Sequence, residues 1–150
     1  MLRFVLLALA VSVAACSSST APVEYITLQV QHATLSHQPD SQYTLVRIEA
    51  RLSNEGAIDA RPFLCAFALQ KDTEGAQGFV TIAASECNEG TGSGPDVSSK
   101  SFLVFNLLSN PRTADVGAAT RFRILLPVFL GEAARQSTLV VSEPFMIVHP

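Results

Sequence analysis

The chain has 150 residues, with ten basic and thirteen acidic side chains and a formal net charge of −3. This length suffices for one domain with a hydrophobic core, and a hydrophobic fraction of 48% argues against an intrinsically disordered chain. The mild negative charge and the absence of a basic run argue against nucleic acid as a partner.

The first fifteen residues, MLRFVLLALAVSVAA, have the layout of a secretory signal peptide. Arg3 supplies a positive charge near the amino terminus, the apolar run over 4–15 is interrupted only by Ser12, and small residues close the run. The run is too short to cross a bilayer as a helix, which takes about 20 residues. We therefore expect residues 1–15 to be a signal peptide that is removed from the mature protein.

The end of this run, Val13-Ala14-Ala15-Cys16, resembles the lipobox of bacterial lipoproteins. The resemblance implies that the Cys16 sulfur receives a diacylglyceryl group, that a peptidase cuts before Cys16, and that the freed amine is acylated. Because two or more acyl chains anchor a protein stably, the membrane would be a permanent partner through the lipid on Cys16. The expected location is the cell envelope. Ser17 stands where the family's inner-membrane retention signal would be an aspartate, which favours the outer membrane if the host is Gram-negative.

The residues after the lipobox divide into a tether and a domain. Residues 16–22, CSSSTAP, are small and polar without periodicity, which predicts a short flexible tether that carries the lipid. Residues 23–150 would form one folded domain. Its apolar and polar side chains alternate with a period of two, and no convincing helical period interrupts them, so we expect strands throughout.

Seven stretches of the domain show the alternation that is typical of half-buried strands. In TLVRIEARLSN, for example, Val46 and Ile48 fall on one face while Arg47 and Glu49 fall on the other. Pro144 in the last stretch predicts a break or an edge position, because proline cannot donate a ladder hydrogen bond. The predicted strands lie within residues 24–32, 44–54, 61–70, 78–87, 101–108, 120–129 and 137–148.

The segments between these stretches carry the Gly, Pro, Asn and Asp residues that are typical of turns. Short strands at this spacing predict an all-β fold, an antiparallel β-sandwich of about seven strands. In strand count and rhythm the domain resembles an immunoglobulin-like or fibronectin-III-like β-sandwich. It departs from true immunoglobulin domains because it has no tryptophan, and because its cysteines are too close in sequence for the usual inter-sheet pair.

Two cysteines, Cys65 and Cys87, remain if Cys16 carries lipid. Outside the cytoplasm an even pair is expected to oxidise, so we predict a disulfide between them. Cys65 falls in an alternating stretch with Phe63 and Phe67, which predicts that its sulfur points into the core.

Two arrangements of the strands would allow this disulfide. In the first, the two stretches that contain the cysteines form a hairpin in which paired positions sum to 152, so that Lys71 faces Thr81. In the second, the two stretches belong to different sheets, and the disulfide crosses or rims the sandwich. The residues alone leave both open.

Residue patterns with catalytic or metal-binding chemistry are scarce. His32 and His37 would lie on opposite faces of a continuous strand, but a turn between them could bring both near Asp40 as a weak candidate metal site. The HExxH and GxSxG motifs are absent, and GTGSG at 90–94 lacks the lysine and the helix of a phosphate-binding loop. We therefore expect no enzymatic activity, no cofactor and no metal.

Two classes of function remain. The expected one is a membrane-anchored, non-catalytic interaction or structural module of the cell envelope, which binds an envelope protein or a surface polymer. Four arginines could line one outer face and bind an anionic polymer: Arg47, Arg51, Arg121 and Arg123. The alternative is a carrier of a small ligand or a metal ion. An interaction module requires an exposed apolar patch, whereas a carrier requires polar groups that converge in a cavity.

Overall fold

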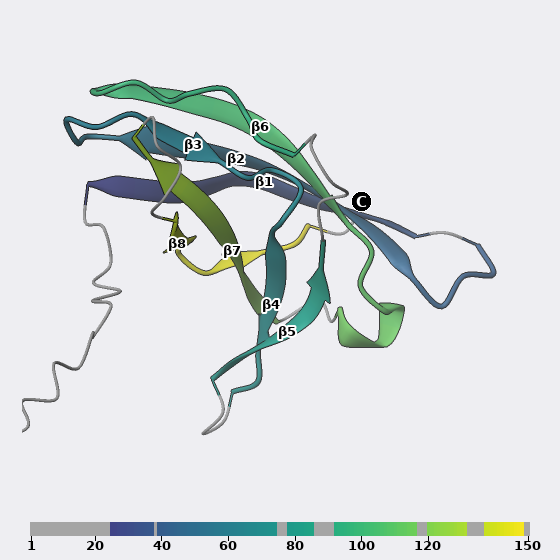
Figure 1. The fold of residues 1–150 in the computed structure, drawn as a ribbon. Helices are drawn as coiled ribbons and strands as arrows, with labels where there is room; N and C mark the ends of the chain where they lie inside the picture. The colour runs from purple at the N-terminus through teal and green to yellow at the C-terminus, as the bar shows by residue number, and fades with distance from the viewer. Residues whose placement is uncertain are drawn as a thin grey trace, which may run out of the picture.

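The domain is an all-β sandwich of two antiparallel sheets packed face to face (Figure 1). The computed structural model describes residues 25–37, 39–74, 78–85, 92–116, 120–131 and 137–148. No helix among them is long and apolar enough to cross a membrane. The elements are β1 (Ile26–His37), β2 (Thr44–Asn54), β3 (Ala60–Pro62), β4 (Ala68–Asp72), β5 (Phe79–Ala84), β6 (Ser101–Ser109), the 3-10 turn η1 (Thr113–Asp115), β7 (Arg121–Leu130), β8 (Ser137–Val141) and β9 (Phe145–Met146).

The first sheet has three strands in the order β1-β2-β6. Central strand β2 pairs Leu52 with Leu28 of β1 and Ala50 with Phe105 of β6. Every second residue of β2 is buried, as the alternation over 44–54 predicts, and the charged residues between them face away from the core. The period-two interpretation of this stretch is confirmed.

The second sheet is organised around β7. Along one side of β7, β3 pairs with its last residues and β4 with its first residues. Along the other side, β8 pairs with the later part of β7 and β9 with its first residues. Strand β5 lies beyond β4. The predicted stretches 61–70 and 137–148 therefore each appear as two short strands in one line, and the second is interrupted beside Pro144 as expected. Among the described residues the two sheets hold seven rows of strand, the number that the alternation predicts.

Strand β1 is longer than predicted. The predicted stretch ends at His32, but the strand continues to His37. A register shift between Val30 and His32 adds one residue to β1. This bulge resets the alternation, so that Ala33 and Leu35 point into the core after it.

The core fills the space between the sheets. Its fully buried large side chains include Ile48 and Leu52 from β2 and Phe122 and Leu126 from β7. Asn54 is also fully buried. Its Nδ2 donates hydrogen bonds to the carbonyl oxygens of Ile58 and Val97, each at 2.8 Å, and its Oδ1 accepts one from the Gly56 N–H. The amide thereby ties the connection after β2 to Val97, which precedes β6, while its own buried polar atoms are satisfied.

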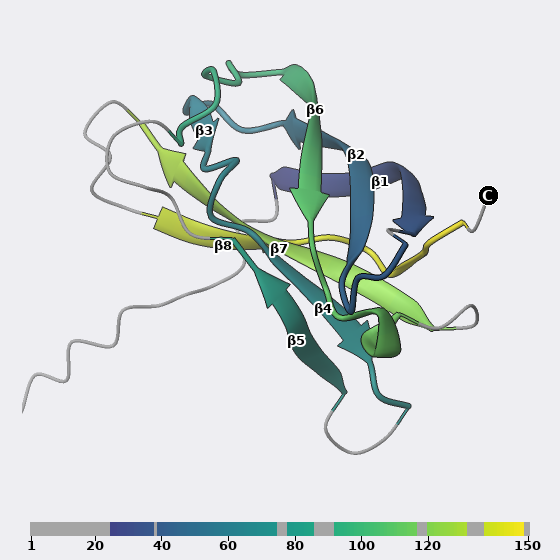
Figure 2. The same ribbon diagram turned by 90° about the vertical axis from the view of Figure 1, so that its right-hand side faces the viewer.

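The two long sides of the sandwich differ. On one side the chain crosses from the second sheet to the first after β9, and Val148 forms a parallel bridge with Thr34 of β1. The Val148 N–H donates to the Ala33 carbonyl at 2.9 Å, and the Leu35 N–H donates to the Val148 carbonyl at 3.2 Å. On the other side, β5 and β6 are the outermost strands of their sheets, and no described strand joins them (Figure 2).

Candidate functional site

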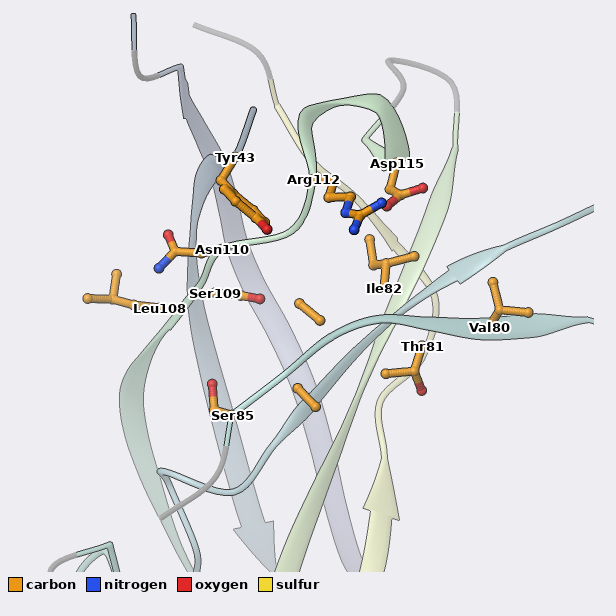
Figure 3. A pocket seen from close by; sticks show the side chains of 12 residues that line it. Tyr43, Val80, Thr81, Ile82, Ser85, Leu108, Ser109, Asn110, Arg112 and Asp115 are labelled. Carbon is orange, nitrogen blue, oxygen red and sulfur yellow. The ribbon is translucent and has the colours of Figure 1, made fainter. Parts of the chain in front are cut away.

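A groove lies on the open side of the sandwich, between β5 and the end of β6 (Figure 3). Its volume is about 490 Å³. We call it the seam groove. Its lining residues are Tyr43, Val80, Thr81, Ile82, Ala83, Ala84, Ser85, Leu108, Ser109, Asn110, Arg112 and Asp115.

The main-chain edges of two strands form the walls of the seam groove. Six consecutive residues, 80–85, line it on the β5 side, and 108–110 line it on the β6 side. Successive side chains of a strand point to opposite faces, so a consecutive run can line one groove only if the strand edge faces it. Such an edge presents backbone N–H and C=O groups that a further strand can pair with.

Backbone hydrogen bonds hold the remaining wall of the seam groove. Tyr43, just before β2, forms an antiparallel bridge with Arg112, which follows β6. The Thr44 N–H donates to the Pro111 carbonyl at 3.0 Å, and the Thr113 N–H donates to the Gln42 carbonyl at 2.9 Å. These bonds fix the start of β2 and the 3-10 turn beside β5. The Tyr43 side chain remains 41% exposed.

A second candidate surface lies on the outer face of the second sheet. Along β7 the outward residues change from Arg121 and Arg123 to Leu125 and Pro127. Their neighbours across the sheet are also apolar, since Leu125 lies opposite Ala68 and Val141, and Pro127 lies opposite Leu139. We call the set Ala68, Leu125, Pro127, Leu139 and Val141 the apolar face.

The apolar face is open to solvent. Leu139 is 53% exposed and Val141 is 44% exposed. A shallow cavity of about 280 Å³ lies over the same region, and Leu125, Pro127 and Leu139 are among its lining residues. The outer face of a sandwich sheet is ordinarily the polar one, so this contiguous apolar area is a candidate contact surface.

The part of the outer face next to the apolar face is polar and internally paired. Arg121 Nη2 lies 2.6 Å from Asp72 Oδ2, and Arg123 Nε donates to Gln70 Oε1 at 2.8 Å. The Arg123 guanidinium also stacks over the Phe79 ring, 4.2 Å from its centroid. These side chains satisfy one another, so this area offers fewer unpaired groups to a ligand.

The expectation that four arginines share one outer face is wrong. Arg47 and Arg51 belong to β2 in the first sheet, whereas Arg121 and Arg123 belong to β7 in the second. Alternation predicts only that each pair of arginines lies on the outward face of its own strand. It does not predict that the two strands belong to different sheets. The Arg51 guanidinium packs on the Phe102 ring at 3.8 Å. An arginine patch for an anionic polymer is therefore not assembled.

Of the two predicted disulfide cysteines, Cys65 lies among the described residues and Cys87 does not. Cys87 and the lipidation residue Cys16 fall outside the described residues. Cys65 lies between β3 and β4 and is half-buried, so the prediction of a core position is wrong. The alternation breaks there, because Phe63 turns outward and its ring contacts Phe129 at a centroid distance of 4.7 Å.

The hairpin arrangement of the cysteine stretches is correct, and the inter-sheet arrangement is wrong. Strands β4 and β5 pair in one sheet, and Ala68 opposite Ala84 matches the predicted register. The register then shifts by one, so that Lys71 faces Val80 and not Thr81. The shift skips Ile82, which lines the seam groove.

The weak metal candidates do not form a cluster. His32 and His37 lie in one continuous strand, and both are exposed. Asp40 belongs to the turn that follows, where it adopts a positive φ of 62°. In the ranges that the structure describes, no group of three or more His, Cys, Asp and Glu side chains is arranged to hold a metal ion.

Sequence reasoning missed the seam groove and the apolar face. The sequence contains one signal for the groove. Residues 79–85 and 101–109 have neither a charged residue nor a proline, which is unusual for edge strands. The signal for the apolar face was the change from Arg123 to Leu125 and Pro127 at outward positions. Neither signal identifies which strands become neighbours.

The comparisons with known proteins support the fold. No protein-family model and no curated protein matches the sequence. The chain is similar in structure to Northeast Structural Genomics Consortium target SoR45, with a TM-score of 0.54 and 13% identity over 85% of this chain and 88% of that chain. It is also similar to the putative ApaA protein from Bordetella pertussis, with a TM-score of 0.50 and 14% identity over 83% and 94%. At such identities the likeness concerns the fold alone.

Proposed function

We propose that this protein is a lipid-anchored, non-catalytic interaction module of the cell envelope. The signal-like run and the Val13–Cys16 pattern support the anchor. The apolar face supports the interaction role, and it is the observation that carries the proposal, because exposed contiguous apolar surface on a folded domain is typical of protein contact sites.

The position of the first strand is compatible with a membrane anchor. Ile26 begins β1 opposite Asn54, whereas Tyr43 and the seam groove lie beyond the other end of the same ladder. The eight residues from 17 to 24 span at most about 28 Å when fully extended. A lipid on Cys16 would therefore keep the Ile26 end near the membrane and leave the seam groove at the far end, accessible to other envelope proteins.

The anchor is tested by changing the lipidated residue. Cys16→Ser removes the thiol that would carry the diacylglyceryl group, so the chain should keep its signal peptide and gain no acyl mass. Wild-type protein extracted from membranes should start at Cys16 and carry added acyl mass in intact-mass analysis. Ser17→Ala is the matched control and should be lipidated normally. A wild-type chain that is cleaved at another residue and released without lipid would refute the anchor.

The interaction role is tested at the apolar face. A photoreactive p-benzoylphenylalanine placed at Leu139 of the membrane-anchored chain should crosslink to an envelope protein on illumination of cells. The same residue at Gln29, exposed on the outer face of β1, should not. Val141→Glu should remove the crosslink, because it puts a charge among apolar neighbours, while Thr27→Glu should leave it unchanged.

The outcome of that experiment separates the two classes of function. Crosslinking that is equal at Leu139 and Gln29, or that survives Val141→Glu, would contradict an interaction role for the apolar face. A small molecule released from the purified protein on unfolding, without any crosslinked protein, would favour the carrier function.

A further inference from the structure

We propose that the seam groove joins two copies of this chain, through antiparallel pairing of β5 with β5 of a second copy. The second sheets of the two copies would form one continuous sheet across a two-fold axis. This inference concerns the edge of β5, which adjoins the apolar face, since Ala84 and Ser85 line both the seam groove and the cavity over that face. It does not depend on the lipid anchor.

The first step is the unpaired state of β5. It is the last strand of its sheet, and among the described residues only β4 pairs with it. Natural edge strands are protected from pairing by charged residues, by proline or by a covering segment. The edge of β1 is covered by Val148, whereas β5 reads FVTIAA and has no charge and no proline. A further strand is the occupant that such an edge fits.

The second step is the identity of that strand. In a two-fold contact the same segment meets itself in antiparallel orientation, and like charges opposite each other would oppose the pairing. Because β5 has no charged residue, self-pairing brings no such repulsion. The rim of the seam groove carries one residue of each sign, Arg112 and Asp115, so two copies can present opposite charges to each other there.

The third step is access. The β4–β5 hairpin extends away from the body of the sandwich in both views of the ribbon (Figures 1 and 2). The free edge of β5 can therefore be reached by a second copy. The β5 of that copy would lie in the seam groove, whose side chains include the exposed Tyr43 and Leu108 and the half-buried Ile82. Pairing would remove these apolar groups from water while satisfying the free backbone groups of both edges.

The test is a charge swap on the exposed positions of β5. Thr81 and Ala84 are exposed, so one full-length chain carries Thr81→Lys with Ala84→Lys, and a second chain with a different tag carries Thr81→Glu with Ala84→Glu. Both are produced in the same cells, extracted in mild detergent and precipitated through one tag. Wild-type copies with the two tags should co-precipitate.

When both tagged copies carry the same charged version, the amount that co-precipitates should fall by about tenfold or more, because like charges oppose each other across the strand pair. The Lys version with the Glu version should recover it in registers that bring positions 81 and 84 of the two copies opposite or diagonal to each other. Recovery requires that both versions fold, so it separates lost pairing from lost folding. The control pair, Thr27→Lys with Gln29→Lys on the exposed face of β1, should co-precipitate like the wild type.

Three results would overturn the proposal. The first is the absence of wild-type self-association, and the second is self-association that the charged versions do not change. The third is a failure of the Lys and Glu versions to restore each other. A photocrosslink from Ser85 to another protein, without any crosslink to a second copy, would assign the seam groove to a strand of that protein.

Discussion

Asp72 ends β4 and accepts hydrogen bonds from two directions. Its Oδ1 accepts the Glu74 backbone N–H at 3.0 Å, in a loop where Glu74 has a positive φ of 54°, and its Oδ2 contacts Arg121 at 2.6 Å. The hydrogen bond from Glu74, followed by the hydrogen bond and charge of Arg121, lowers the pKa of Asp72 below its ordinary value, although burial opposes this. The ionised carboxylate therefore stabilises the end of the hairpin.

We predict that this carboxylate makes the domain sensitive to acid. A lowered folded-state pKa contributes stability that is fully present above the unfolded value of about 3.9 and is lost as the pH falls through the folded value. Asp72→Asn should lower the free energy of unfolding at pH 7, and its difference from the wild type should shrink as the pH falls below about 4. Denaturant unfolding at several pH values measures this.

The matched control for Asp72 is Glu143→Gln, an exposed carboxylate without an ion pair among the described residues. It should leave the free energy of unfolding at pH 7 nearly unchanged, because an exposed side chain without an ion pair contributes little to stability. High salt should reduce the effect of Asp72→Asn, because Arg121 is largely exposed and its charge is screened. An Asp72→Asn protein that is as stable as the wild type at pH 7 would contradict the role given to Asp72.

At the scale of elements, the β4–β5 hairpin sharpens the disulfide prediction. Ala68 pairs with Ala84, and the Ser85 N–H donates to the Phe67 carbonyl at 2.9 Å, so pairing of the two stretches reaches Phe67. Cys65 lies in the turn before it, where the Ala66 N–H donates to the Phe63 carbonyl at 3.2 Å, so a disulfide would tie this turn to the chain after β5. Such a bond needs Cα atoms within about 7 Å of each other.

We predict that Cys65 and Cys87 form this disulfide in the exported protein. Thiol titration of the unfolded, unreduced protein should find no free sulfhydryl from either residue. Replacing both with serine should lower the free energy of unfolding by about 2–5 kcal/mol, the range for native disulfides. Ser85→Ala is the control for a small change in the same hairpin and should leave stability nearly unchanged. Two titratable thiols in exported wild-type protein would show that the prediction is wrong.

The elements also show how far the sequence determines this fold. Alternation over 44–54 and 120–129 identifies β2, β7 and their buried faces, because each residue's side is set locally. The bulge in β1 and the skipped Ile82 in β5 carry no comparable local signal, so the extent of β1 and the position of Thr81 were mispredicted. A bulge depends on the partner strand, and the partner is chosen by contacts distant in the sequence.

At the scale of the whole molecule, both candidate surfaces depend on which strands become neighbours. The seam groove combines Tyr43, β5 and the segment after β6, which lie far apart in the chain. The apolar face requires β8 to pair with β7 beside β4. Strand alternation predicts a sandwich but not its strand order, so the residues of these surfaces could be recognised individually while their assembly could not.

The bridge between Val148 and β1 also sets the order in which the domain can be completed. Strand β1 is among the first parts of the domain to be synthesised, yet its edge is covered by Val148, which lies far later in the chain. Contacts between such distant residues form slowly, because a long loop must close first. A nascent chain therefore cannot cover this edge of β1 before residue 148 has been synthesised. The proposed export of this chain in an unfolded state would benefit from this order, because the edge of β1 stays uncovered until residue 148 has been made.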